Sequence, residues 1–145
     1  MRRTKILVID DDESLRRVLE YNLAQEGYAV LTAASGEQGL DHLRKEGADL
    51  VVTDVRMAGM DGLRVMEEVR KLDPSIQVII LTAFGTIETA IQAIRQGADD
   101  YVTKPFALAE ISLLVASSCA EAQPPALPSM ENTSQMPLSS KLTVT

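Results

Sequence analysis

The residues of this chain that could do chemistry stand at the ends of short apolar runs. They are acidic residues, one hydroxyl and one lysine: Asp10, Asp11, Asp12, Asp54, Thr82 and Lys104. Two or three carboxylates brought together repel one another, and a hard divalent cation relieves that repulsion. Mg²⁺ prefers oxygen ligands and is usually held by one or two carboxylates with phosphate and water. These residue types indicate magnesium-dependent phosphoryl chemistry, provided that the fold gathers them.

Asp54 is the residue around which such a site would form. A carboxylate at the end of a buried strand is costly unless its charge is offset. With Mg²⁺ held by Asp54 and Asp11, and with Asp10 as a water-mediated ligand, Asp54 could act as a nucleophile toward phosphorus. Lys104 would bring a positive charge to a phosphoryl oxygen, and Thr82 a hydroxyl donor. Positioning and charge neutralisation are what phosphoryl transfer demands.

Five apolar runs alternate with five segments of helical periodicity. We expect strands over residues 5–10, 28–33, 49–53, 77–82 and 100–103. We expect helices over residues 36–45, 62–72, 86–96 and 107–119, and a first helix that runs from an N-cap at Ser14 to Gly27. This alternation predicts an α/β fold with a doubly wound parallel sheet. The four polar strand ends then share one edge, where ligands bind in such sheets.

Asp12 has a simpler alternative role than chemistry. Carboxylates favour helix N-termini, so an acidic residue after a strand can be a solvated turn residue or a helix N-cap. We therefore keep Asp12 outside the candidate site.

Composition excludes some classes of function. Fourteen Lys and Arg against twenty-one Asp and Glu give a net charge of −7, which argues against nucleic-acid binding by this segment. No apolar span of 18 residues and no signal-peptide segment follows Met1, so we expect no membrane association and a cytoplasmic location. The single Cys119 forms no internal disulfide, which permits a reducing compartment.

The character of the chain changes near residue 120. The last residues are rich in Pro, Ser and Thr and show no sustained apolar period. We expect one domain over residues 1–119 and a disordered tail or linker over residues 120–145.

Six short motifs follow one another within residues 5–119. They are VIDDD at 8–12, DVRM at 54–57, GMDG at 59–62, LTA at 81–83, GADDY at 97–101 and KPF at 104–106. With these motifs the chain resembles the receiver domains of two-component response regulators. The resemblance implies a flavodoxin-like sheet of five parallel strands in the order 2-1-3-4-5. It also implies a phosphorelay switch that controls a partner or output domain, in the context of transcription regulation.

The resemblance carries roles onto individual residues. Asp54 would be the phosphoacceptor for a sensor histidine kinase, and the domain would catalyse only its own phosphorylation and dephosphorylation. Asp10 and Asp11 would hold Mg²⁺ together with Asp54 and the backbone carbonyl of Arg56. Lys104 and Thr82 would contact the phosphoryl group, and Tyr101 would turn inward as Thr82 moves. A homodimer through the fourth helix, fifth strand and fifth helix is typical of the family.

Some stretches refine the resemblance and others depart from it. The residues around Arg56 and the segment 83–97 look most similar to receivers of the nitrogen-regulation, sigma-54-activator subfamily. Ala58 stands where the family usually has Pro, which removes no ligand. Residues 120–145 contain no ATPase loop and no helix-turn-helix pattern, so we expect no output domain within them. Arg56 and Phe84 would flank the route of the hydrolytic water and could lengthen the life of the phosphate.

Three other functions are compatible with an α/β sheet. A haloacid-dehalogenase-like phosphatase needs a second Asp two residues after the nucleophile, where this chain has Arg56, and a cap for which no insertion exists. A flavodoxin-type carrier needs a Ser/Thr-rich phosphate loop after the first strand, and this chain lacks such a loop there. A receiver-shaped binding module that takes no phosphate is disfavoured, because the residues that phosphate chemistry needs are intact: Asp11, Asp54, Thr82 and Lys104.

Overall fold

The computed structural model of the protein describes residues 3–57, 59–82 and 87–122. Five strands and five helices alternate along this part of the chain, as predicted. The strands are β1 (Lys5–Ile9), β2 (Ala29–Ala33), β3 (Leu50–Asp54), β4 (Gln77–Thr82) and β5 (Asp100–Thr103). The helices are α1 (Glu13–Gln25), α2 (Gly36–Glu46), α3 (Gly62–Leu72), α4 (Ile87–Gln96) and α5 (Leu108–Ala122).

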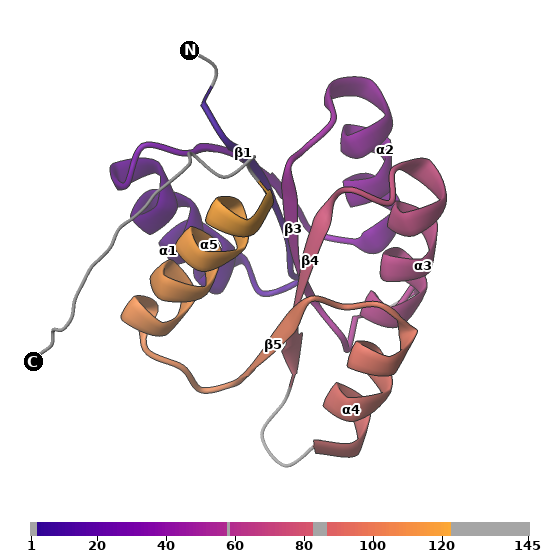
Figure 1. Cartoon of the computed structure of the whole chain (residues 1–145). Coiled ribbons are helices and arrows are strands. Elements are labelled where there is room, and N and C mark those ends of the chain that lie inside the picture. The colour runs from indigo at the N-terminus through magenta and orange to yellow at the C-terminus, as the bar shows by residue number, and fades with distance from the viewer. Residues whose placement is uncertain (1–2, 58, 83–86, 123–145) are drawn as a thin grey trace, which may run out of the picture.

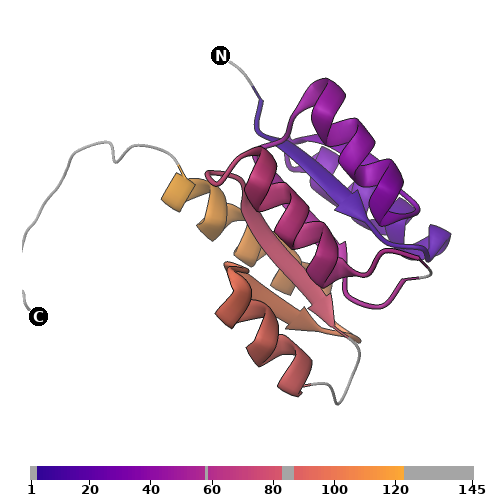
Figure 2. The same cartoon turned by 90° about the vertical axis from the view of Figure 1, so that its right-hand side faces the viewer.

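The strands form one parallel sheet in the order β2-β1-β3-β4-β5, which confirms the predicted order. Figure 1 shows α1 and α5 on one face of this sheet and α2, α3 and α4 on the other. Figure 2 looks onto the face that α2, α3 and α4 cover. The protein therefore has the flavodoxin-like, doubly wound α/β fold that was expected.

An apolar core lies on each face of the sheet, because successive strand residues point to opposite faces. Leu7 and Val51 belong to the cluster under α2 and α3, whereas their neighbours Val8 and Val52 belong to the cluster under α1 and α5. Both faces of the central strands are thus buried, which explains why these strands are continuously apolar in sequence. This burial fixes the register of the strands and, with it, the place where each strand ends.

The first turn of α1 differs from its prediction. Asp12 is the N-cap, and its carboxylate accepts a hydrogen bond of 3.2 Å from the backbone N–H of Leu15. Ser14 lies inside the helix, so its predicted role as the cap is wrong, whereas the capping role considered for Asp12 is confirmed. The reason is that α1 begins at Glu13, one residue before the predicted cap.

The other element ends shift by a few residues. β1 ends at Ile9, so Asp10 lies just beyond it, whereas β3 includes Asp54, which pairs with Leu81 of β4. α5 continues to Ala122 because no Gly or Pro interrupts it there. The predicted tail lies outside the described residues from residue 123 onward. Within the described part of the chain, no helix is both long and apolar enough to cross a bilayer.

Candidate phosphoryl-transfer site

The sheet order brings the polar strand ends together. β1, β3, β4 and β5 are neighbours, and their register aligns Ile9 with Thr53 and Thr82 with Thr103. Asp10 and Lys104 each follow the last residue of a strand, and the backbone N–H of Lys104 donates to the carbonyl of Thr82 at 2.7 Å. The predicted convergence at one edge of the sheet is therefore observed.

Lys104 is the centre of the site. Its Nζ lies 2.9 Å from Oδ2 of Asp10 and 3.0 Å from Oδ2 of Asp54. Asp10 is completely buried and Asp54 is only 7% exposed. Two carboxylates with so little solvent need a compensating charge, and the ammonium group supplies it. The peptide bond between Lys104 and Pro105 is cis.

The loop after β3 holds Asp54 from the other side. Oδ1 of Asp54 accepts a hydrogen bond of 3.3 Å from the backbone N–H of Arg56. The N–H of Gly62, the first residue of α3, donates to the carbonyl of Val55 at 2.9 Å. A Cβ on Gly62 would lie 2.2 Å from the carbonyl oxygen of Asp54, so only glycine lets α3 start this close to Asp54. The GMDG motif at 59–62 does not by itself reveal this packing role of Gly62.

The site contains a set of oxygen donors that suits Mg²⁺. Carboxylate oxygens of Asp10, Asp11 and Asp54 all lie within 4.8 Å of one another. Asp11 is exposed, and among the residues that the structure describes its side chain has no hydrogen-bond or ion-pair partner. Such a donor set fits a hard cation that keeps several of its waters.

Opposing effects act on the pKa of Asp54. Removal from water raises this pKa, a hydrogen bond from Lys104 lowers it, and the negative charge of Asp10 raises it again. The net result is a pKa above the usual range of an aspartate. A further cation beside Asp54 would therefore stabilise the charged form of its carboxylate.

The pKa of Lys104 is raised, which keeps its ammonium group charged. Burial alone would lower it, but the hydrogen bonds to Asp10 and Asp54 and the charges of both carboxylates raise it overall. Lys104 therefore remains a cation at neutral pH.

The remaining predicted residues lie at this edge or beside it. Thr82 is buried at the end of β4, and Tyr101 is 37% exposed on β5. Arg56 takes part through its backbone N–H, while the role of its carbonyl stays a prediction. Ala58 and Phe84 lie outside the described residues.

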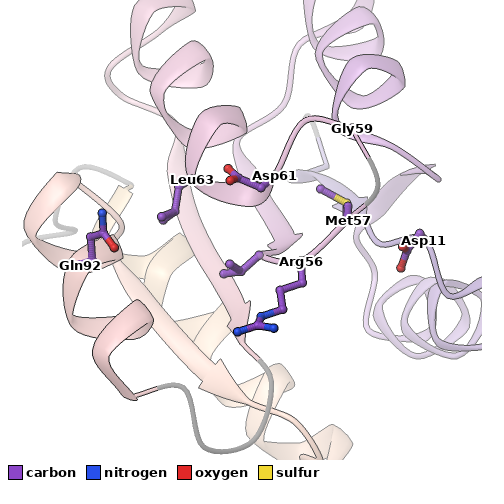
Figure 3. A pocket seen from close by; sticks show the side chains of 8 residues that line it. Asp11, Arg56, Met57, Gly59, Asp61, Leu63 and Gln92 are labelled. Carbon is purple, nitrogen blue, oxygen red and sulfur yellow. The ribbon is translucent and has the colours of Figure 1, made fainter.

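A cavity of about 650 Å³ opens beside the site. Figure 3 shows its lining side chains, which come from the loop after β1, the segment between β3 and α3, the first turn of α3, and α4. They are Asp11, Val55, Arg56, Met57, Gly59, Asp61, Leu63 and Gln92. Asp11 therefore lies between the acidic cluster and this cavity, whereas Asp54 and Lys104 are not among the residues that line it.

The fold and the site define a class: a doubly wound α/β protein with an acidic, lysine-paired site at the carboxyl edge of its sheet. The family model described as "Response regulator receiver domain" matches residues 6–116, and the chain belongs to this family. The protein is thus a receiver of two-component phosphorelay signalling. Receivers are phosphoacceptor switches and not classical enzymes, so the phosphatase and flavodoxin alternatives are set aside.

Relatives and solved structures agree with this assignment. The transcriptional regulatory protein GlrR of Escherichia coli K12 is 46% identical over 100 residues, covering 69% of this chain and 22% of that protein. The probable transcriptional regulator ycf27 of Cyanophora paradoxa is 43% identical over 125 residues, covering 86% of this chain and 52% of the relative. The crystal structure of the receiver domain of NtrX from Brucella abortus is 33% identical, with a TM-score of 0.75 over 78% of this chain and 96% of that one.

These relatives also bear on subfamily and length. GlrR and NtrX agree with the predicted similarity to the nitrogen-regulation subfamily. The chain spans only between 22% and 52% of the length of these two curated relatives.

Proposed function

We propose that Asp54 accepts a phosphoryl group from a sensor histidine kinase, with Mg²⁺ held by Asp10, Asp11, Asp54 and the carbonyl of Arg56. The observation that carries this proposal is the position of Lys104, whose Nζ bridges Asp10 and Asp54 while Asp11 faces an open cavity. The site thus offers Asp54 as the acceptor, the ammonium group of Lys104 to contact the transferred phosphoryl group, and Asp11 as a metal ligand, all within reach of a phosphodonor.

The chain's own residues account for the transfer step. An oxygen of Asp54 forms the new bond to phosphorus while the bond between phosphorus and the donor breaks, and the electron pair of that bond leaves with the donor. Lys104 moves from the carboxylate to a phosphoryl oxygen, and Thr82 donates its hydroxyl to another. Mg²⁺, when bound, neutralises the charge that carboxylates and phosphoryl oxygens bring together.

The response to phosphorylation belongs to the same proposal. Thr82 is drawn toward the phosphoryl group, and Tyr101 turns inward from the surface of β5. Two states separated by a few kcal/mol are enough, because the phosphoryl group biases the equilibrium between them.

The face of α4, β5 and α5 is the surface that we propose for a partner or a second copy. Large apolar side chains are exposed along it: Ile91, Ile94, Tyr101 and Leu108. Exposed apolar clusters of this kind favour association. The net charge of −7 makes direct nucleic-acid binding by this segment unfavourable, so control of transcription would run through an output partner or domain.

Domain limits and location complete the proposal. Residues 1–119 form the receiver, with α5 continuing to Ala122, and the segment beyond is a tail or a linker. Family membership supports a cytoplasmic location.

The proposal is tested by intact mass after incubation with acetyl phosphate, with and without Mg²⁺. The wild-type chain should gain one phosphoryl group only when Mg²⁺ is present, and Asp54→Ala should gain none. Asp41→Ala is the matched control, because Asp41 is an exposed aspartate whose carboxylate pairs with Lys45, far in sequence from the acidic cluster. Undiminished phosphorylation of Asp54→Ala would overturn the assignment.

A further inference from the structure

Arg16 of α1 reaches back to the turn that carries the acidic residues. Its Nη1 donates a hydrogen bond of 2.8 Å to the backbone carbonyl of Asp10. The side chain is partly buried, and it forms no ion pair with any residue in the described ranges. Arg16 belongs to none of the motifs of the chain and has no part in the proposed phosphoryl transfer.

Every polar group of Asp10 has a partner. Its N–H donates to the carbonyl of Ala33 at 3.1 Å, and its Oδ1 accepts from the N–H of Asp12 at 2.9 Å. Its Oδ2 binds Lys104, and its carbonyl binds Arg16. Four contacts in different directions leave Asp10 no freedom to turn.

Asp11 is in the opposite situation. It contributes a carboxylate to the acidic cluster but has no side-chain partner among the described residues. Its direction is therefore set only by its backbone. The carbonyl of Asp10 and the N–H of Asp11 belong to one planar peptide, so a bond that fixes this carbonyl also fixes the start of Asp11.

From this geometry we infer that Arg16 is a positioning residue of the magnesium site, which holds the Asp10–Asp11 peptide and so directs the Asp11 carboxylate toward the cation. The inference rests on the proposed function, because it assumes that Asp11 is a magnesium ligand. Residues that orient metal ligands commonly change metal affinity by about 10–100-fold when they are replaced.

The charge of Arg16 has the opposite effect on Mg²⁺. A guanidinium near three carboxylates repels a second cation, so removing it would tighten binding if charge alone mattered. Arg16 remains in contact with solvent, and at 0.15 M salt the screening length is about 8 Å, which weakens this repulsion. The sign of the change in Mg²⁺ affinity therefore separates positioning from charge.

The experiment is a calorimetric titration of the full chain with MgCl₂ at 0.15 M salt. Arg16→Met removes the donor and the charge but keeps an apolar stem, and its dissociation constant for Mg²⁺ should rise by about tenfold. Arg16→Lys keeps one donor group and should recover part of the affinity. Arg17→Met is the matched control and should bind as the wild type does, because Arg17 is 77% exposed and, within the described residues, bonds to Glu13 alone.

A second readout guards against a general loss of structure. Melting curves in EDTA establish that each variant is folded at the assay temperature, and Arg16→Lys serves in place of Arg16→Met if the latter is not. In phosphorylation by acetyl phosphate, Arg16→Met should need more Mg²⁺ but reach the wild-type maximal rate. Unchanged or tighter Mg²⁺ binding by a folded Arg16→Met would overturn the inference. Absence of Mg²⁺ binding by the wild type would instead overturn the proposed function.

Discussion

At the scale of single residues, the site is a balance between two buried carboxylates and one ammonium group. Lys104 is bonded to Asp10 and Asp54 at once, and both of their side chains are almost without solvent. Burial still leaves the pKa of Asp54 above its ordinary value, so one cation does not fully compensate this carboxylate. The balance explains why such a site would take a second cation and why a phosphoryl group would redistribute its contacts.

Removing the ammonium group should destabilise the protein when Mg²⁺ is absent. Breaking a buried pair typically costs 3–5 kcal/mol, and for Lys104→Met we expect about 2–3 kcal/mol because Lys104 retains some solvent contact. Urea denaturation in EDTA at pH 7 measures the loss. Lys45→Met is the control, since Lys45 is exposed and pairs only with Asp41 at 3.5 Å. Equal unfolding free energies for the two variants would contradict the central role of Lys104.

Replacing Asp54 by Asn should stabilise the Mg²⁺-free protein at pH 7. The folded-state pKa of Asp54 is raised, mainly by burial, so its carboxylate is less favourable in the folded chain than in the unfolded one. This penalty is absent at pH values below the pKa of Asp54 in the unfolded chain. It is complete at pH values above the pKa of Asp54 in the folded chain. The variant should therefore gain on the wild type as the pH rises through that interval, and the two should converge in acid.

Chemical denaturation in EDTA over a series of pH values checks this expectation. Asp41→Asn provides the reference for loss of an exposed carboxylate. An Asp54→Asn variant that is less stable than the wild type at pH 7 would show that Lys104 outweighs the cost of burial.

At the scale of elements, the start of α3 is the feature that brings a helix against the acceptor strand. A Cβ at position 62 would meet backbone atoms, namely the carbonyl oxygen of Asp54 at 2.2 Å and the Cα of Val55 at 2.8 Å. Backbone atoms cannot rotate away, so α3 or the end of β3 would have to move. The acceptor would move with them.

Gly62→Ala should lower the free energy of unfolding by about 3 kcal/mol, at the upper end for overpacking, and reduce phosphorylation of Asp54. Gly39→Ala on α2 is the matched control, because its Cβ would meet side-chain atoms and no backbone atom of another element, the nearest being Cδ1 of Ile9 at 2.4 Å and Cγ1 of Ile9 at 2.8 Å. That side chain can give way, so a smaller loss is expected. Urea denaturation ranks the two variants, and a loss at Gly39 that equals the loss at Gly62 would contradict the backbone argument.

The elements themselves were predictable because their patterns are strong. Apolar runs of four to six residues and helical periodicity between them locate all ten elements to within a few residues. Long-range side-chain contacts were not predictable in this way. Arg70 of α3 donates to the backbone carbonyls of Pro74, Ile76 and Gly97 and to the carboxylate of Asp99, and no local pattern announces this link between α3 and the start of β5.

At the scale of the whole molecule, topology turns a scattered set of residues into a site. Asp10 and Lys104 are 94 positions apart in sequence, yet they are joined because β1 and β5 end at the same edge of one sheet. The sequence predicted the gathering of Asp10, Asp54, Thr82 and Lys104 from that edge alone. It could not predict which side chains would already be paired, because pairing depends on side-chain directions that only the packed fold sets.

The chain is one receiver whose relatives are longer regulators. It covers 22% of GlrR and 52% of the ycf27 regulator of Cyanophora paradoxa. Thr82 ends β4, and Tyr101 lies on the neighbouring strand β5. The exposed apolar side chains of α4, β5 and α5 lie on or beside these two strands. A change at the sheet edge can therefore reach this surface over a short path.

The most direct test of the account is to locate the phosphoryl group on the chain. After phosphorylation with acetyl phosphate and Mg²⁺, borohydride reduction converts an aspartyl phosphate to homoserine, and peptide mass mapping finds the converted residue. The account predicts homoserine at position 54 and at no other aspartate. Conversion at Asp11 or Asp61 instead, or no conversion of a chain that has gained a phosphoryl group, would contradict the assignment of Asp54 as the acceptor.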